Sequence, residues 1–269
     1  MIIDFHTHAF PDKIVKRTIS ILEGNIEKYS DYTYHAFGDG SVGGLIENMK
    51  SEGIDASVVL PIATSPKQTE NINAFAALIN GKDGIYSFGS LHPDNDDING
   101  ILESIKESGL KGIKLHPEYQ NFYIDSEKSV RILKKCDELG LYTLIHAGND
   151  HGCPLPRHCE PERLKNVLSE VSGRHIIAAH LGGWTMWDDV AKHLIGTPIM
   201  LDTCFSLHLM DKKTASDMIK AHGADKVLFG TDWPWYSQKK TYEHLSALDL
   251  SDEEKQLISG TNARKILGI

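Results

Sequence analysis

The sequence predicts an α/β fold, a single (β/α)8 TIM barrel with a small insertion after its first strand. Two observations predict it. Short segments with the composition of buried strands alternate with longer amphipathic segments along the chain. His6 and His8 near one end of the chain are matched by Asp232 near the other, and a closed barrel sets its first strand beside its last. An open doubly wound sheet is the alternative, but it would leave His6 and Asp232 without a common rim.

Eight segments have the length and composition of strands, at residues 2–6, 57–61, 85–89, 110–115, 142–146, 174–179, 198–202 and 227–230. Amphipathic segments between them predict helices at residues 43–51, 67–80, 98–108, 127–139, 161–171, 184–194 and 212–221. In the segment 127–139, Val130, Leu133 and Cys136 recur at helical spacing. The insertion at residues 11–40 contains a further helix and a polar aromatic stretch, and we expect it to cover part of a pocket.

Composition and charge narrow the class of protein. A chain of 269 residues with 41% hydrophobic content can bury a large core, so we expect one domain over residues 1–269. The net charge of −9, without a block of Lys or Arg, argues against nucleic acid and anionic membranes as the main partner and favours a small-molecule substrate. No apolar run approaches about 20 residues, which predicts neither a signal peptide nor a membrane span and makes the cytoplasm the expected location.

Two further expectations concern the cysteines and the assembly. Four cysteines are too few for a disulfide framework in a chain of this size, so we expect reduced thiols. Barrels of this kind commonly form homo-oligomers, and a homo-oligomer is therefore an open expectation, although no interface can be recognised in the sequence.

His6 and His8 are the strongest chemical signal in the chain. Residues i and i+2 of a strand face the same way, so both imidazoles can bind one ion from a single strand end. A set of nitrogen ligands and a carboxylate, here Asp232, suits zinc or a similar divalent metal better than calcium or magnesium. We therefore expect one divalent metal ion, with zinc first and manganese as the alternative, in a metal-dependent enzyme. The competing interpretation is a pair of strand-end histidines that only pack.

Histidines also gather where strands end. Of the 14 histidines, six lie at or just after a predicted C-terminal strand end, which is the rim where the loops of a TIM barrel form the active site. They are His6, His8, His92, His116, His146 and His180. This clustering indicates function rather than packing.

Five motifs carry a resemblance to a known family. In order, they are His6-x-His8, Gly112-Ile113-Lys114-Leu115-His116-Pro117, Leu144-Ile145-His146-Ala147-Gly148, Ala179-His180-Leu181-Gly182-Gly183 and Phe229-Gly230-Thr231-Asp232-Trp233-Pro234. Their order and spacing resemble the amidohydrolase superfamily, specifically its amidohydrolase-related branch, which includes aminocarboxymuconate-semialdehyde decarboxylase, resorcylate decarboxylases, hydrolases and lactonases. The ending at residues 260–267 is similar to the terminal helix of that branch.

The resemblance implies a role for each matched residue. His6 and His8 match the first-strand metal ligands, His146 the fifth-strand ligand, and Asp232 the eighth-strand carboxylate that touches the metal and moves protons. His180 matches the sixth-strand histidine, which polarises the substrate or transfers a proton. Three imidazoles and a carboxylate leave an open coordination position, as a catalytic site requires.

Candidate substrate contacts surround these residues. Three roles are open for Lys114: a carbamylated bridge between two metal ions, a partner for a substrate carboxylate, or a structural residue. His116 follows two residues later. Arg157, in the loop 151–159, could clamp a carboxylate through two hydrogen bonds. That loop holds two His and two Cys, but their spacing is wrong for a structural zinc site. Trp233 follows a strand that carries a proposed ligand, and we expect it to line an apolar pocket.

The sequence leaves three hypotheses about the function. The favoured one is hydrolysis of an amide, ester or lactone bond in a small, carboxylate-bearing molecule, with Asp232 as general base. The alternative is non-oxidative decarboxylation of an aromatic or unsaturated acid, in which Asp232 or His180 handles the carbon-bound proton. We favour hydrolysis because decarboxylases of the branch usually have longer chains, which is an argument by association. The third is a binding protein that retains the barrel without turnover.

Overall fold

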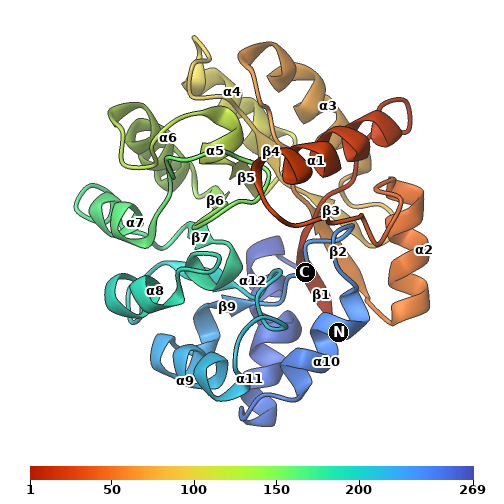
Figure 1. The fold of residues 1–269 in the computed structure, drawn as a ribbon. Coiled ribbons are helices and arrows are strands. Elements are labelled where there is room, and N and C mark those ends of the chain that lie inside the picture. The colour runs from red at the N-terminus through yellow and green to blue at the C-terminus, as the bar shows by residue number, and fades with distance from the viewer.

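Parallel strands form the centre of the molecule and helices surround them (Figure 1). The computed structural model describes residues 1–269. The strands are β1 (Ile3–Thr7), β2 (Ala56–Val59), β3 (Ile85–Ser87), β4 (Gly89–Ser90), β5 (Gly112–Leu115), β6 (Tyr142–Ile145), β7 (Ile176–Ala178), β8 (Met200–Asp202) and β9 (Val227–Leu228). Neighbours along the chain pair in parallel, in the orders β1-β2-β3 and β4-β5-β6-β7-β8-β9.

Two junctions close these strands into a barrel. β3 and β4 form one continuous segment around Phe88, whose amide donates to the carbonyl of Val59 at 3.0 Å, so together they are the single strand predicted at residues 85–89. At the other junction, the amide of Phe5 donates to the carbonyl of Phe229 at 2.7 Å. Thr7 and Trp233 add a parallel bridge just beyond β9. The predicted (β/α)8 barrel is therefore confirmed.

Helices fill the connections between strands. They are α1 (Val15–Tyr29), α2 (Val42–Glu52), α3 (Thr69–Ile79), α4 (Ile98–Glu107), α5 (Pro117–Gln120), α6 (Glu127–Leu139), α7 (Pro161–Val167), α8 (Trp187–His193), α9 (Lys212–His222), α10 (Gln238–Ser246), α11 (Asp252–Gln256) and α12 (Asn262–Leu267). Each predicted helix is present, and α1 lies within the predicted insertion. α8 begins three residues later than expected because Thr185 has a left-handed backbone, with φ of 55°, which an α-helix does not allow. None of the helices has the length and hydrophobicity that a membrane span requires.

The pairing between β1 and β2 is irregular near His6. Phe5, Val58, Leu144 and Ile177 belong to one buried cluster, to which α12 also contributes. Successive side chains of a regular strand point to opposite faces, so in a regular β1 the side chain of His6 would point away from the barrel interior, where Phe5 lies. The pairing of β1 with β2 shifts between residues 4 and 7, and such a bulge redirects a side chain. His6 consequently reaches the mouth of the barrel.

The four cysteines are buried and unpaired, as expected for reduced thiols.

Candidate active site

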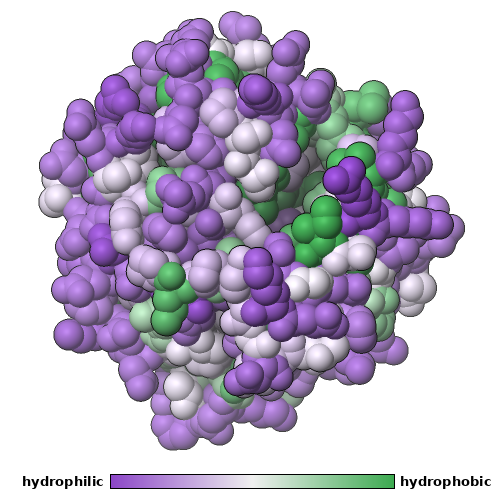
Figure 2. Space-filling view, turned by 45° about the horizontal axis from the view of Figure 1, so that its top comes forward, coloured by the Kyte–Doolittle hydropathy of each residue, from purple (hydrophilic) through white to green (hydrophobic).

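A cavity of about 520 Å³ opens at the C-terminal ends of the strands. Its polar end is lined by His6, His8, Lys114, His116, His146, Asp150, His180 and Asp232. Figure 2 shows a face of the molecule on which hydrophobic side chains gather beside a hollow. Five of the six strand-end histidines line this cavity. His92 does not, because its Nδ1 accepts a hydrogen bond from the amide of Asp94 at 3.1 Å and serves the loop after β4.

His6, His8 and Asp232 converge as the sequence predicts. Asp232 Oδ1 lies 3.1 Å from His8 Nε2 and 3.6 Å from His6 Nε2. Ligand atoms about 2.1 Å from a tetrahedral ion lie about 3.4 Å from one another, so these separations are those that a divalent metal needs. The three side chains therefore fit a divalent metal ion in both donor type and spacing.

Outer contacts orient both imidazoles for this task. His6 Nδ1 lies 2.8 Å from Asp202 Oδ2, and His8 Nδ1 lies 3.0 Å from the carbonyl of Leu60. When each Nδ1 donates its proton to these acceptors, the lone pair of each Nε2 is available to a metal ion. Such outer partners fix the ring orientation and the tautomer of metal-binding histidines. Sequence analysis missed Asp202, although its place at the end of a predicted strand was the available signal.

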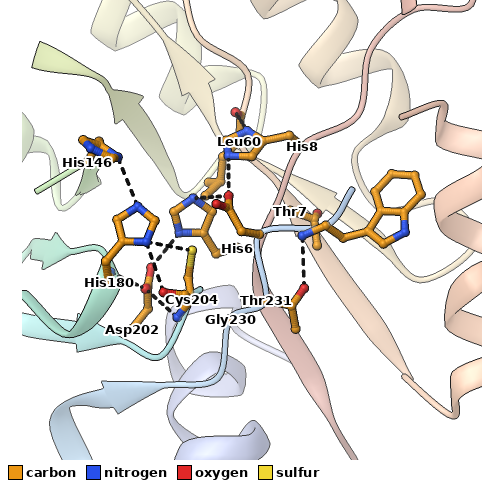
Figure 3. A network of polar contacts seen from close by, with 12 residues as sticks. His6, Thr7, His8, Leu60, His146, His180, Asp202, Cys204, Gly230 and Thr231 are labelled. Carbon is orange, nitrogen blue, oxygen red and sulfur yellow. Dashed lines mark hydrogen bonds and ion pairs between the residues drawn. The ribbon is translucent and has the colours of Figure 1, made fainter. Parts of the chain in front are cut away.

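His146, the fourth expected ligand, lies outside this group. Figure 3 shows the imidazole of His180 standing between those of His146 and His6. His180 Nε2 is 3.0 Å from His146 Nδ1, and His180 Nδ1 is 3.1 Å from the carbonyl of Cys204. The other nitrogen of His146, Nε2, lies 3.0 Å from the carbonyl of Asn149. Both nitrogens of His146 thus face protein atoms other than the His6–Asp232 group.

Lys114 is buried beside the proposed metal ligands. It is 1% exposed, and its Nζ lies 3.2 Å from His6 Nε2. Burial lowers the pKa of Lys114, while the nearby carboxylates of Asp202 and Asp232 act in the opposite direction. Burial and the charge of Lys114 likewise lower the pKa of His6 well below its usual range. Lys114 therefore offers a desolvated amino group at the polar end of the cavity.

A second polar group lies on the other side of His146. His116 stacks on His146 with ring centroids 4.1 Å apart, and its Nε2 lies 3.2 Å from Asp150 Oδ2. The Nδ1 of His116 accepts a hydrogen bond from the amide of Tyr119 at 3.3 Å, at the start of α5. His116 therefore keeps its proton on Nε2, which donates to Asp150. Asp150 and Tyr119 were missed in the sequence because they lie in connections without strand or motif signals.

Asp232 is held in a strained and electrostatically tuned position. Its φ is 71°, a left-handed conformation that is uncommon for residues other than glycine, and its amide donates to the carbonyl of His6 at 2.8 Å. Burial raises the pKa of Asp232, but the hydrogen bond with His8 and the charges of His6, His8 and His180 together hold it well below its ordinary value. Asp232 is therefore a carboxylate at neutral pH.

The segment around Asp232 is supported from below by Asp4. The carboxylate of Asp4 accepts hydrogen bonds from the Thr231 amide at 3.1 Å and from Gln238 Nε2 at 2.7 Å. Gly230 lies so close to β1 that a Cβ atom there would stand 2.8 Å from His6 Cβ. This close approach requires glycine and brings Asp232 within reach of both histidines.

Two of the predicted substrate contacts lie away from the cavity. Arg157 donates to Asn149 Oδ1 at 2.9 Å and to the carbonyl of Cys153 at 3.1 Å, so it braces its own loop. Trp233 is 1% exposed and packs in the core beside β9, with its indole against Gly38. The tryptophans that line the cavity are instead Trp184 and Trp235. Sequence order could not separate these neighbours because the direction of each side chain depends on tertiary contacts.

Comparisons with known proteins agree with this architecture. The sequence profile of the Amidohydrolase family matches residues 3–269. A comparison with curated protein sequences yields no match. Among solved structures, a 2,6-dihydroxybenzoate decarboxylase with bound 2,6-dihydroxybenzoate is 15% identical with a TM-score of 0.69, over 100% of this chain and 99% of that one. A 5-carboxyvanillate decarboxylase from Sphingomonas paucimobilis is 14% identical with a TM-score of 0.68, over 100% and 99%.

A third structure contains a metal ion. It is a dihydroxybenzoic acid decarboxylase from Polaromonas with bound manganese and the inhibitor 2-nitroresorcinol, 14% identical, with a TM-score of 0.68 over 99% of this chain and 96% of that one. At these identities the structural matches show the shared fold. The family profile covers nearly the whole chain, and this chain belongs to the amidohydrolase family.

Proposed function

We propose that this protein is a metal-dependent, non-oxidative decarboxylase of a small aromatic or unsaturated carboxylic acid. The observation that carries the proposal is the polar end of the cavity, where the His6–His8–Asp232 group adjoins the buried amino group of Lys114. Lys114 is the single Lys or Arg that lines the cavity. A substrate carboxylate can therefore pair with Lys114 through one oxygen atom while its other oxygen atom approaches the metal-binding group.

Decarboxylation is favoured over hydrolysis by the structural comparisons. The sequence favours hydrolysis because decarboxylases of the branch usually have longer chains. The structural alignments nevertheless cover 99% of both the 2,6-dihydroxybenzoate and the 5-carboxyvanillate decarboxylase chains, so this chain matches nearly their whole length. The apolar wall of the cavity also supports the proposal, because apolar surroundings favour loss of a charged carboxylate as neutral carbon dioxide. Hydrolysis of a carboxylate-bearing amide, ester or lactone is the second candidate.

The metal ion would be held by His6, His8 and Asp232, with zinc or manganese as the candidates. Imidazole and carboxylate donors suit zinc, and the Polaromonas decarboxylase contains manganese. When bound, a divalent ion supplies a fixed positive charge that orients and polarises the oxygen atoms of the substrate.

The proton balance assigns a role to Asp232. The bond between the ring carbon and the carboxylate breaks, its electron pair stays on the carbon, and that carbon gains one proton. Water supplies this proton, and Asp232, which lines the cavity beside His6 and His8, would pass it to the carbon. His180 positions the group instead, since both of its ring nitrogens already have protein partners.

The proposal is tested with protein loaded with manganese or zinc and with a panel of hydroxybenzoates, including 2,6-dihydroxybenzoate and 5-carboxyvanillate. We expect substrate-dependent release of carbon dioxide, without oxygen from ¹⁸O-labelled water in the organic product. Incorporation of ¹⁸O into a product carboxyl group, with esters or lactones as substrates, would favour hydrolysis instead. Metal content of the wild type beside a His6→Ala/His8→Ala variant separates loss of the ion from loss of the fold.

A further inference from the structure

The cavity has a second arm, lined mainly by apolar side chains, that extends away from its polar end. Ile14, Thr18, Leu22 and Ile26 all line the cavity, at intervals of four residues. Side chains at this spacing lie on one face of a helix, so α1 and the residue before it present a single row to the cavity. At a rise of about 1.5 Å per residue, the row extends about 18 Å.

The segments opposite this row contribute apolar side chains together with the uncharged polar Thr64, Gln68 and Asn71. Leu60 and Ile62 follow β2, and Ile72 and Phe75 lie on α3; all four line the same cavity. The charged lining residues are Lys114, Asp150 and Asp232, which belong to the polar end. The arm between α1 and α3 thus contains uncharged side chains throughout and is continuous with the site that would bind a carboxylate.

We propose that the acid this enzyme acts on carries an extended apolar substituent, such as an alkyl chain or a second ring, on the side away from its carboxylate. This inference rests on the proposed function. A benzoate spans about 5 Å from its carboxylate oxygens to the far ring carbon, given bonds near 1.5 Å, and so covers a small part of the row on α1. A longer apolar ligand would also cover the rest of the arm. Removal of this apolar surface from water makes a favourable contribution to the free energy of binding.

Helix α1 provides matched positions for the test. Leu22 is half-buried and lines the arm, whereas its neighbour Ile21 is 51% exposed and lies outside the lining. Leu22→Gln therefore places a polar group in the arm, and Ile21→Gln makes the same kind of change on the outer face of the same helix. Phe75→Ala shortens the opposite wall and gives a second variant on a different element.

The experiment measures binding of 4-methyl-, 4-butyl- and 4-octylbenzoate to the metal-loaded protein by isothermal titration calorimetry. We expect Kd to fall about fourfold for each added methylene group until the arm is filled. Leu22→Gln and Phe75→Ala should weaken the octyl compound at least tenfold and the methyl compound less than twofold, while Ile21→Gln should change neither. Equal Kd values across the series, or equal losses for Leu22→Gln and Ile21→Gln, would overturn the inference.

Failure of the inference and failure of the proposed reaction give different results. Turnover of short hydroxybenzoates without any gain in affinity from the alkyl chain would overturn the inference and leave the reaction intact. Chain-length-dependent binding that Leu22→Gln abolishes, together with no carbon dioxide from any hydroxybenzoate, would support the arm as the binding site for an apolar acid and overturn decarboxylation. Circular dichroism of each variant shows that the fold is retained.

Discussion

The two ends of the barrel differ in side-chain chemistry and in how often a residue other than glycine has a left-handed backbone, which at the N-terminal ends occurs at Asp83, before β3. At the C-terminal ends of the strands, three residues that line the cavity have left-handed backbones without being glycine: His180 with φ of 60°, Phe205 with 46° and Asp232 with 71°. At the N-terminal ends, polar side chains serve the backbone instead. Asn262 donates to the carbonyls of Ala224 and Val227, both at 2.8 Å.

This difference indicates that the C-terminal end of the barrel serves function and that the N-terminal end serves stability. Strained conformations and buried ionisable groups cost free energy, and they persist only where surrounding structure compensates. The N-terminal end supplies part of that compensation through buried hydrogen bonds such as those of the Asn262 amide group. We therefore expect changes at the C-terminal end to alter metal binding and turnover, and changes at the N-terminal end to alter the free energy of unfolding.

The largest expected effect is that of Asp232→Asn on turnover. An amide keeps the shape of the carboxylate but can neither carry the proton nor supply the negative charge, so we expect kcat to fall at least about 100-fold. The free energy of unfolding, measured by urea denaturation, should change by less than about 1 kcal/mol because the substitution is isosteric. Retention of full activity would remove Asp232 from the chemistry. The exposed Asp225→Asn serves as the control.

At the opposite end, Asn262→Ala should act on stability alone. The substitution removes two buried hydrogen bonds to backbone carbonyls, which costs about 2 kcal/mol. Urea denaturation measures this loss, and the kcat of the folded variant should match the wild type. Thr261→Ala, at the exposed neighbouring residue, should be nearly neutral. A large fall in kcat with unchanged stability would contradict the division between the two ends.

Asp202→Asn tests whether an outer partner governs the metal site. Asp202 accepts from His6 Nδ1 and from the amide of His180, and loss of such a partner typically weakens metal binding about tenfold to a hundredfold. Competition with a fluorescent chelator for zinc measures the affinity. An unchanged zinc affinity would show that His6 needs no support from Asp202.

The smallest effect concerns the pH dependence of stability. Burial lowers the pKa of His222 from 6.5 to about 4. The Nε2 of this buried imidazole lies 2.8 Å from the carbonyl of Ile199. Because the folded-state pKa lies below the unfolded value, His222 contributes stability above pH 6.5, and this contribution is lost as the pH falls toward 4. Between pH 7 and pH 5 the wild type should lose about 2 kcal/mol more than His222→Gln.

Urea denaturation at both pH values provides the measurement for His222. His35→Gln, at an exposed histidine, is the control and should follow the wild type. Parallel losses in the wild type and in His222→Gln would assign the acid sensitivity to other groups.

Much of the fold and the centre of the site could be predicted from local patterns. Strand composition at eight places, with amphipathic helices between them, is sufficient for the barrel because each element carries its own periodicity. The i, i+2 spacing of His6 and His8 and the closure of the barrel then bring Asp232 to them, as the distances of 3.1 and 3.6 Å show. These features depend on chain order and backbone geometry, both of which the sequence contains.

The tertiary structure decided which side chains meet around that centre. The sequence does not show that a bulge in β1 turns His6 into the mouth, that His180 separates His146 from His6, or that Arg157 bonds to its own loop. It likewise does not show that Trp235 lines the cavity while Trp233 packs in the core. Side-chain direction at strand ends and in loops depends on contacts between residues far apart in the chain, and those contacts exist only once the barrel has closed.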